Sequence, residues 1–149
     1  MKISYKGDYS LKTILELSLN YNSKKIVQIK SMAKKLNIPV KYLEQLLLIL
    51  KGAGYVRSIR GPSGGYFLAR HPKEITVGEI IRKVEGDTAP IACVGSSSYN
   101  RCEDTVHCVF RQIWVDVKNS INNIVDNITF EDLVKRVREK ETKNFVYNI

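Results

Sequence analysis

The chain contains three cysteines, and all of them lie within one stretch of sixteen residues: Cys93, Cys102 and Cys108. An odd number of cysteines cannot be fully paired in disulfides, and the loop that holds the first two is rich in Gly, Ser and Asn. Clustered thiolates in a polar loop suit a soft metal ion or an iron–sulfur cluster, although their spacing matches no zinc-finger pattern. The alternative is three small buried hydrophobic side chains, which is how isolated cysteines usually behave. The sequence favours the metal or cluster site.

Three thiolates leave one ligand position of such a site unassigned. His107 directly precedes Cys108, and adjacent side chains on a helix point about 100° apart, so one small site would not take both. One turn after Cys108 stands Arg111, which cannot bind a metal. The remaining candidates are Glu103, Asp104, an external thiol or water, or a group from a partner subunit.

A cationic hairpin is predicted earlier in the chain. Two β-prone runs, 55–59 and 66–69, flank a turn that consists of Gly61, Pro62, Ser63, Gly64 and Gly65. We expect three arginines to surround the tip of this hairpin: Arg57, Arg60 and Arg70. A flexible cationic hairpin directly after a helical segment is typical of winged-helix proteins, which use it to follow a nucleic-acid backbone. The alternative is a solvated surface hairpin.

Three helical segments precede the hairpin, over residues 8–21, 29–36 and 40–51. Asp8 or Ser10 is available as the N-cap of the first segment. A short helix, a turn and a longer helix form a helix-turn-helix, whose second helix reads base edges in the major groove. Four residues near the start of that second helix are predicted to lie on its exposed side: Lys41, Tyr42, Glu44 and Gln45.

The formal net charge of +9 is concentrated in the N-terminal half. Residues 1–70 contain 13 Lys and Arg against 3 Asp and Glu, whereas residues 71–149 contain 11 against 12. This asymmetry predicts that the first half meets a polyanion. Because the sequence has no apolar run of 18 residues and no signal-peptide pattern, we expect a soluble, cytoplasmic protein that binds double-stranded DNA and no membrane. RNA binding is not favoured, since no aromatic stacking motif accompanies the basic residues.

The C-terminal half is predicted to contain a long amphipathic helix. Thr76 and Glu79 form a capping box that begins a helix to about residue 84, and a polar loop follows over 86–105. Over 106–128, apolar residues recur at steps of three and four for about six turns, or roughly 33 Å. A small winged domain cannot cover so long a stripe, so we predict a homodimer that buries it. Thr129 is predicted to cap a last helix, and four residues to hold the tail: Phe145, Val146, Tyr147 and Ile149.

The predicted fold is mainly α with a small β-hairpin. With 149 residues, 44% of them hydrophobic, the chain is long enough to bury one core. We expect a winged helix-turn-helix DNA-binding domain over 1–85, a cysteine-bearing sensor loop over 86–105, and a dimerisation helix with a C-terminal helix and tail over 106–149.

Three runs of the sequence resemble bacterial winged-helix regulators that include IscR, NsrR and CymR: IPVKYLEQL at 38–46, GYVRSIRGPSGGYFL at 54–68 and ITVGEII at 75–81. The resemblance extends over nearly the whole chain and implies homodimers that bind partly palindromic operators. It also implies that Glu44, with its neighbours Lys41 and Gln45, contacts the major groove. By the same resemblance, Arg60 at the wing tip enters the minor groove.

In the cluster-binding branch of these regulators, three loop cysteines before the dimer helix hold the iron. The resemblance therefore implies a [2Fe-2S] or [4Fe-4S] cluster on Cys93, Cys102 and Cys108. This sequence departs from the pattern in its longer first gap and in Arg111, which stands where the IscR type has a histidine ligand. In NsrR-like members an aspartate at the start of the first helix, supplied by the other subunit, completes the site, and Asp8 has that position here. The alternative for Asp8 is a simple helix N-cap.

Two regulatory hypotheses and one enzymatic hypothesis follow. The first is a transcription regulator whose operator affinity depends on an iron–sulfur cluster, as a sensor of redox state or nitric oxide. The second is a cluster-free, CymR-like regulator controlled by a partner protein, a small ligand or thiol redox state. A small redox enzyme is not favoured, because the chain has no nucleotide-binding glycine motif, no C-x-x-C and no Cys/His pair placed for nucleophilic catalysis.

Overall fold

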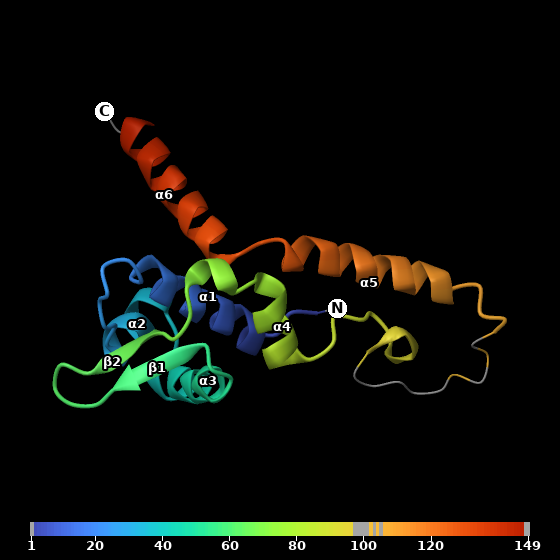
Figure 1. The fold of residues 1–149 in the computed structure, drawn as a ribbon, viewed down its shortest axis with the longest axis horizontal. Helices are drawn as coiled ribbons and strands as arrows, with labels where there is room; N and C mark the ends of the chain where they lie inside the picture. Colours follow the sequence, from blue (N-terminus) through green and yellow to red (C-terminus); the bar gives the residue numbers. More distant parts are fainter. Residues whose placement is uncertain (1, 97–101, 103, 105, 148–149) are drawn as a thin grey trace.

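A computed structural model describes residues 2–96, 102, 104 and 106–147, and this part of the chain is mainly α-helical with one β-hairpin (Figure 1). The predicted fold class is therefore confirmed. The elements in chain order are α1 (Tyr5–Leu19), α2 (Ile29–Leu36), α3 (Val40–Gly52), β1 (Val56–Ile59), β2 (Gly65–Leu68), η1 (Pro72–Glu74), α4 (Val77–Glu85), η2 (Ala92–Val94), α5 (Arg111–Asp126) and α6 (Phe130–Tyr147).

Helix α1 begins earlier than predicted. Its N-cap is Ser4, whose side chain accepts a hydrogen bond from the Gly7 amide, so neither Asp8 nor Ser10 is the cap. Glu85, at the end of α4, accepts hydrogen bonds from the backbone N–H and the hydroxyl of Ser4. The cap prediction was wrong because a contact between residues 81 positions apart selects the first turn of this helix.

The helix-turn-helix and the wing agree closely with prediction. Asn37 caps the C-terminal end of helix α2, with a left-handed backbone and φ of 53°, and α3 begins three residues later. The antiparallel strands of the wing pair Ile59 with Gly65 at the tip end. Val27, in the extended segment before α2, exchanges two backbone hydrogen bonds of 2.9 Å with Tyr66. The segment that enters the helix-turn-helix is thus bonded to the wing.

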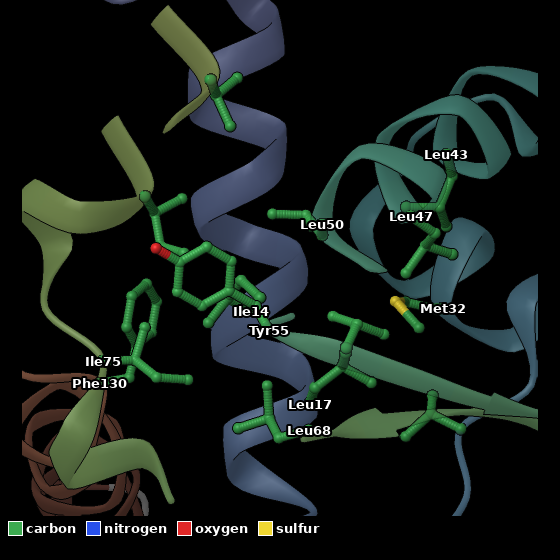
Figure 2. Close-up of a cluster of buried hydrophobic side chains, with 14 of the residues drawn as sticks. Ile14, Leu17, Met32, Leu43, Leu47, Leu50, Tyr55, Leu68, Ile75 and Phe130 are labelled. Carbon is green, nitrogen blue, oxygen red and sulfur yellow. The ribbon is translucent and has the colours of Figure 1, made fainter. Parts of the chain in front are cut away.

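One hydrophobic core joins α1, α3 and the hairpin (Figure 2). Helix α1 contributes Ile14 and Leu17, and α3 contributes Leu43, Leu47 and Leu50, all of them almost fully buried. Each such side chain contributes about 1.5–3 kcal/mol by leaving water. Because the three leucines of α3 follow helical spacing, their burial determines which face of α3 remains outside.

Helix α6 completes this core from beyond the predicted DNA-binding domain. Phe130 is fully buried and lies beside Ile75 in Figure 2, and its N–H donates to the Ile75 carbonyl at 3.0 Å. Thr129 caps α6 as predicted, and its hydrogen bonds to Asp132 lower the pKa of that carboxyl group. The core is therefore not confined to residues 1–85.

Helix α5 is shorter than predicted, with 16 residues that span about 24 Å. The apolar spacing continues before it through Val106 and Val109, but these residues lie in turns. There the Asp104 carbonyl accepts from the amides of both His107 and Cys108. Periodicity alone could not separate such turns from a helix, so Cys108 precedes α5 and does not lie in its first turn.

The two C-terminal helices leave the body of the molecule in different directions (Figure 1). Helix α6 continues to Tyr147, so the predicted tail is helical through that residue. The side chains of 145–147 and all of Ile149 lie outside the described residues, and the prediction that they hold the tail stays a prediction.

Candidate nucleic-acid interface and cysteine loop

The outer face of α3 presents three of the four predicted base-contacting residues. Lys41, Glu44 and Gln45 are exposed, whereas the leucine stripe of the same helix is buried. Tyr42 is half-buried, and its ring packs edge-on against Tyr9 of α1 with centroids 5.9 Å apart. Contrary to the prediction, Tyr42 therefore anchors α3 to α1 instead of projecting freely from it.

Leu48 is a further exposed residue of this face, with 69% of its surface accessible. It follows Glu44 by four residues and Gln45 by three, so the three side chains are neighbours on the helix surface. An apolar side chain among polar ones in a major groove suits contact with the methyl group of thymine. Leu48 was not predicted because it lies in an apolar run, where only helical phase separates it from buried Leu47 and Leu50.

Glycines shape the tip of the wing. Gly61 has φ of 115°, a conformation that favours glycine, and its carbonyl accepts a hydrogen bond from the Gly64 amide at 2.9 Å. Four consecutive residues at the tip are exposed: Arg60, Gly61, Pro62 and Ser63. The Pro62 carbonyl accepts from the Gln28 side chain at 3.5 Å, so the tip is tied to the start of α2.

Of the three wing arginines, Arg60 alone lies at the tip. Arg57 is exposed near the other end of β1, opposite Phe67. Arg70 follows β2 and stacks on the Tyr55 ring at 5.7 Å, while its guanidinium donates to the Glu74 carbonyl at 2.6 Å. The expectation that Arg70 surrounds the tip was wrong, because its packing on Tyr55 commits it to the base of the hairpin. Burial, followed by the Glu79 charge, raises the pKa of Tyr55.

Exposed lysines and arginines lie on α2, α3 and the wing. Lys51 donates to the Ser58 hydroxyl at 2.6 Å and so joins α3 to β1. Lys35 is engaged differently, since it forms a 2.7 Å ion pair with Glu16, whose side chain is only 8% exposed. We call the following set the cationic surface: Lys30, Lys34, Lys41, Lys51, Arg57 and Arg60.

The cysteine loop is less organised than the cationic surface. Cys93 lies half-buried in η2, Cys102 is exposed and Cys108 is half-buried, and none of the three forms a disulfide. Among the residues that the structure describes, no three His, Cys, Asp or Glu side chains are grouped to hold a metal ion. The predicted ligand set is therefore not gathered within one chain. Glu103, a candidate fourth ligand, lies outside the described residues.

The first part of this loop is fastened to α5. The Lys118 ammonium donates to the Val94 carbonyl at 2.9 Å and to the Ser96 hydroxyl at 3.3 Å, and it lies 3.9 Å from the Asp87 carboxylate. The Thr88 hydroxyl, almost fully buried, donates to Asn122 of α5 at 2.6 Å. These contacts determine where η2, and with it Cys93, lies relative to α5.

Asp8, the predicted fourth ligand, lies one turn into α1. Its carboxylate pairs with Lys12 at 2.7 Å and is about half exposed. The start of α1 adjoins the root of the cysteine loop, because Lys6 donates to the Val84 carbonyl at 3.3 Å. Asp8 thus lies on the side of the domain from which the loop departs.

The apolar stripe of helix α5 has one edge that packs against the same chain and one edge that is exposed. One edge faces α4 and η2, and the Arg82 guanidinium of α4 pairs with Asp126 at 2.6 Å. The other edge, together with Phe110 just before the helix, is open to solvent, with exposed fractions from 37% to 61%: Phe110, Ile113, Val117 and Ile124. Apolar side chains are exposed here in a single chain, and a second copy that packs on this edge would bury them.

Comparisons with known proteins agree on the class. A family model named Rrf2 and described as an iron-dependent transcriptional regulator matches residues 3–136. The chain is similar to the structure of CymR (YrzC), the global cysteine regulator of B. subtilis, with a TM-score of 0.78 and 36% identity over 91% of this chain and 98% of that one. It is similar to T. potens IscR, with a TM-score of 0.76 and 35% identity over 94% and 90% of the two chains.

A curated relative, the HTH-type transcriptional regulator IscR of Pectobacterium atrosepticum, is 32% identical over 90% of this chain and 79% of its own length. These matches confirm the resemblance seen in the sequence and the class of regulator over that of enzyme. None of the described helices has the combination of length and apolar composition that a membrane span requires.

Proposed function

Because the chain belongs to the Rrf2 family of helix-turn-helix transcription regulators, we propose that it binds double-stranded operator DNA as a homodimer and that an iron–sulfur cluster in its cysteine loop controls this binding. The observation that carries the proposal is the attachment of η2 to α5. Cys93 lies in η2, and the exposed edge of α5 is the surface that we assign to the dimer. Binding or loss of a cluster at Cys93 would therefore take place next to the dimer contact.

In this proposal, the outer face of α3 reads bases in the major groove. Lys41, Glu44, Gln45 and Leu48 supply a cation, a carboxylate, an amide and an apolar group, which together can distinguish base edges. Arg60 enters the minor groove, where a narrow A·T-rich groove attracts a guanidinium. Pro62, Ser63, Gly64 and Gly65 shape the wing tip at the backbone, and the other cations of the surface position the domain on phosphates.

The cysteine thiols fit an iron–sulfur cluster in their chemistry, although one chain does not gather them in the part described. We propose that Cys93, Cys102 and Cys108 hold the cluster in the dimer and that Asp8 of the partner subunit supplies the fourth ligand. When bound, such a cluster supplies a redox-active centre whose carboxylate-ligated iron is its most exchangeable position. The ion pair with Lys12 holds the Asp8 carboxylate at the surface, where the partner's loop could reach it.

A second candidate function keeps the DNA-binding role without a cluster. It is favoured by the separation of the three thiols in the described chain and by the equally high similarity to CymR, named a global cysteine regulator. In this case a partner protein, a small ligand or the redox state of the thiols would control operator binding.

Anaerobic purification distinguishes the two candidates. The proposed function predicts a coloured protein with visible absorption and with iron and acid-labile sulfide in equal amounts, and a Cys102→Ser variant without either. Colourless protein that contains no iron after anaerobic reconstitution, and still binds its operator in a thiol-dependent manner, would favour the second candidate.

A further inference from the structure

A cavity of about 490 Å³ lies where the end of α1 and the turn after it meet the hairpin. The apolar part of its lining, here called the floor, comes from α1, from the segment after the turn and from both strands of the hairpin: Leu17, Ile26, Ile59, Phe67 and Leu68. Tyr21 also lines it and is held by an edge-on contact with His71, with ring centroids 4.9 Å apart. The volume is within the range of small-molecule sites, which is about 300–1,000 Å³.

The rim of the cavity is cationic and polar. Lys24 and Lys25 are exposed there beside Asn20 and Asn22, and none of the described carboxylates lines the cavity. In the described part of the chain neither lysine forms an ion pair, in contrast to Lys35, which is paired with Glu16. Backbone carbonyls at the end of α1 already accept hydrogen bonds, for example Tyr21 O from the Lys24 amide at 3.0 Å. The ammonium groups are therefore the charged rim groups available to a ligand.

We propose that this cavity binds a small amphipathic carboxylate, such as a medium-chain aliphatic acid. Its apolar chain would contact Ile26 and Phe67, and its carboxylate would lie between Lys24 and Lys25. This assignment goes beyond DNA binding and is independent of the cluster, since none of its residues belongs to the cysteine loop. A charged head at a cationic rim and an apolar tail in a concave floor match the two surfaces that the cavity offers.

Occupancy of the cavity is expected to weaken operator binding. Ile59 and Phe67 belong to the wing, so a bound chain contacts the element that carries Arg60. The carboxylate would also offset one of the two ammonium charges in the half of the chain that carries the excess positive charge. Loss of positive charge lowers affinity for a phosphate backbone and the salt dependence of binding.

The probe is octanoate, which is titrated into the protein by calorimetry, and changes in amide chemical shifts locate the site where it binds. A ligand of ten heavy atoms is expected to bind with a Kd of about 1 mM. The double variant Lys24→Gln/Lys25→Gln should weaken octanoate binding at least tenfold, and Ile59→Glu, which adds a carboxylate to the floor, should do the same. The matched control Lys30→Gln/Lys34→Gln removes two exposed cations of α2 that do not line the cavity, and it should bind octanoate like the parent protein.

Octylammonium, with the same chain and the opposite charge, should not bind. The proposal is overturned if octanoate binds the parent protein and Lys24→Gln/Lys25→Gln equally, if octylammonium binds as well as octanoate, or if octanoate up to 20 times the expected Kd shifts no amide of Tyr21 or Phe67. Preparations with and without a cluster should bind octanoate equally. A protein that does not bind octanoate would therefore contradict the cavity proposal but not the proposed function.

Discussion

The DNA-reading head and the cysteine loop are built in different ways. The head, formed by α2, α3 and the wing, is held by leucines that are buried in the same chain, and its exposed residues follow from that burial. In the loop, hydrogen bonds to α5 hold the first part, but the three thiols are not brought together among the described residues. In the proposed function the first site is complete in one chain, whereas the second would need a partner subunit, a metal or both. The predictions below test this difference.

The largest effect is expected from Ile113→Asp on the exposed edge of α5. The substitution would bury an unpaired carboxylate in the dimer contact, at a cost of several kcal/mol to dimerisation. Operator binding would then fall as well, because each half-site contributes only part of the operator affinity. We expect a monomer by light scattering and a loss of operator binding of at least a hundredfold. The control is Asn119→Asp, which adds the same charge at an exposed position on the opposite face of α5. A dimeric Ile113→Asp protein would show that the interface lies elsewhere.

The second prediction concerns the ligands of the loop. After anaerobic reconstitution, Cys102→Ser should lack the visible chromophore, whereas Asp8→Ala should keep a labile chromophore with an altered spectrum, because carboxylate ligation is weaker than thiolate ligation. Both variants should still fold and should bind non-specific DNA at low salt, since the head does not depend on the loop.

Lys12→Ala is the matched control for Asp8→Ala. It breaks the same 2.7 Å ion pair but keeps the carboxylate, so it should leave the spectrum unchanged. If Asp8→Ala behaves like Lys12→Ala in spectrum and reactivity, Asp8 is a helix residue only. The fourth ligand would then be sought among His107, Glu103 and Asp104.

The third prediction separates the tip arginine from the arginine at the hairpin base. Arg60→Ala should lower operator affinity about tenfold, reduce the slope of affinity against salt by about 1 per subunit, and weaken any preference for an A·T-rich minor groove. Arg70→Ala should instead lower the melting temperature through the lost contact with Tyr55, with little change in salt slope. The reverse pattern would place Arg70, and not Arg60, at the DNA.

The sequence was sufficient where local patterns decide the structure. The leucine spacing of α3, the glycines of the wing and the Thr76–Glu79 capping box all predicted elements that the structure contains. These features need only neighbouring residues, so they can be recognised without a fold.

The sequence was insufficient where distant contacts decide. The Ser4 cap depends on Glu85, and the place of Arg70 depends on its contact with Tyr55. Likewise, Phe130 enters a core whose other members lie mostly before residue 85. Whether the three cysteines come together also depends on distant contacts. Their spacing in the sequence shows which thiols are available but not where they lie relative to one another.

The smallest predicted effect, and the most specific, concerns Leu48. If its side chain contacts a thymine methyl group, Leu48→Ala should lower operator affinity about three- to fivefold, whereas Glu44→Ala should change which base is preferred, because a carboxylate acts by accepting from a base edge such as cytosine N4. An operator with deoxyuridine in place of thymidine removes the methyl group and nothing else. The parent protein should bind this DNA more weakly than the thymidine operator, and Glu44→Ala should lose the same factor in affinity. Leu48→Ala should bind the two operators equally well. Additive losses for Leu48→Ala and the uridine operator would show that Leu48 and the methyl group do not touch, because independent sites add and contacting groups do not.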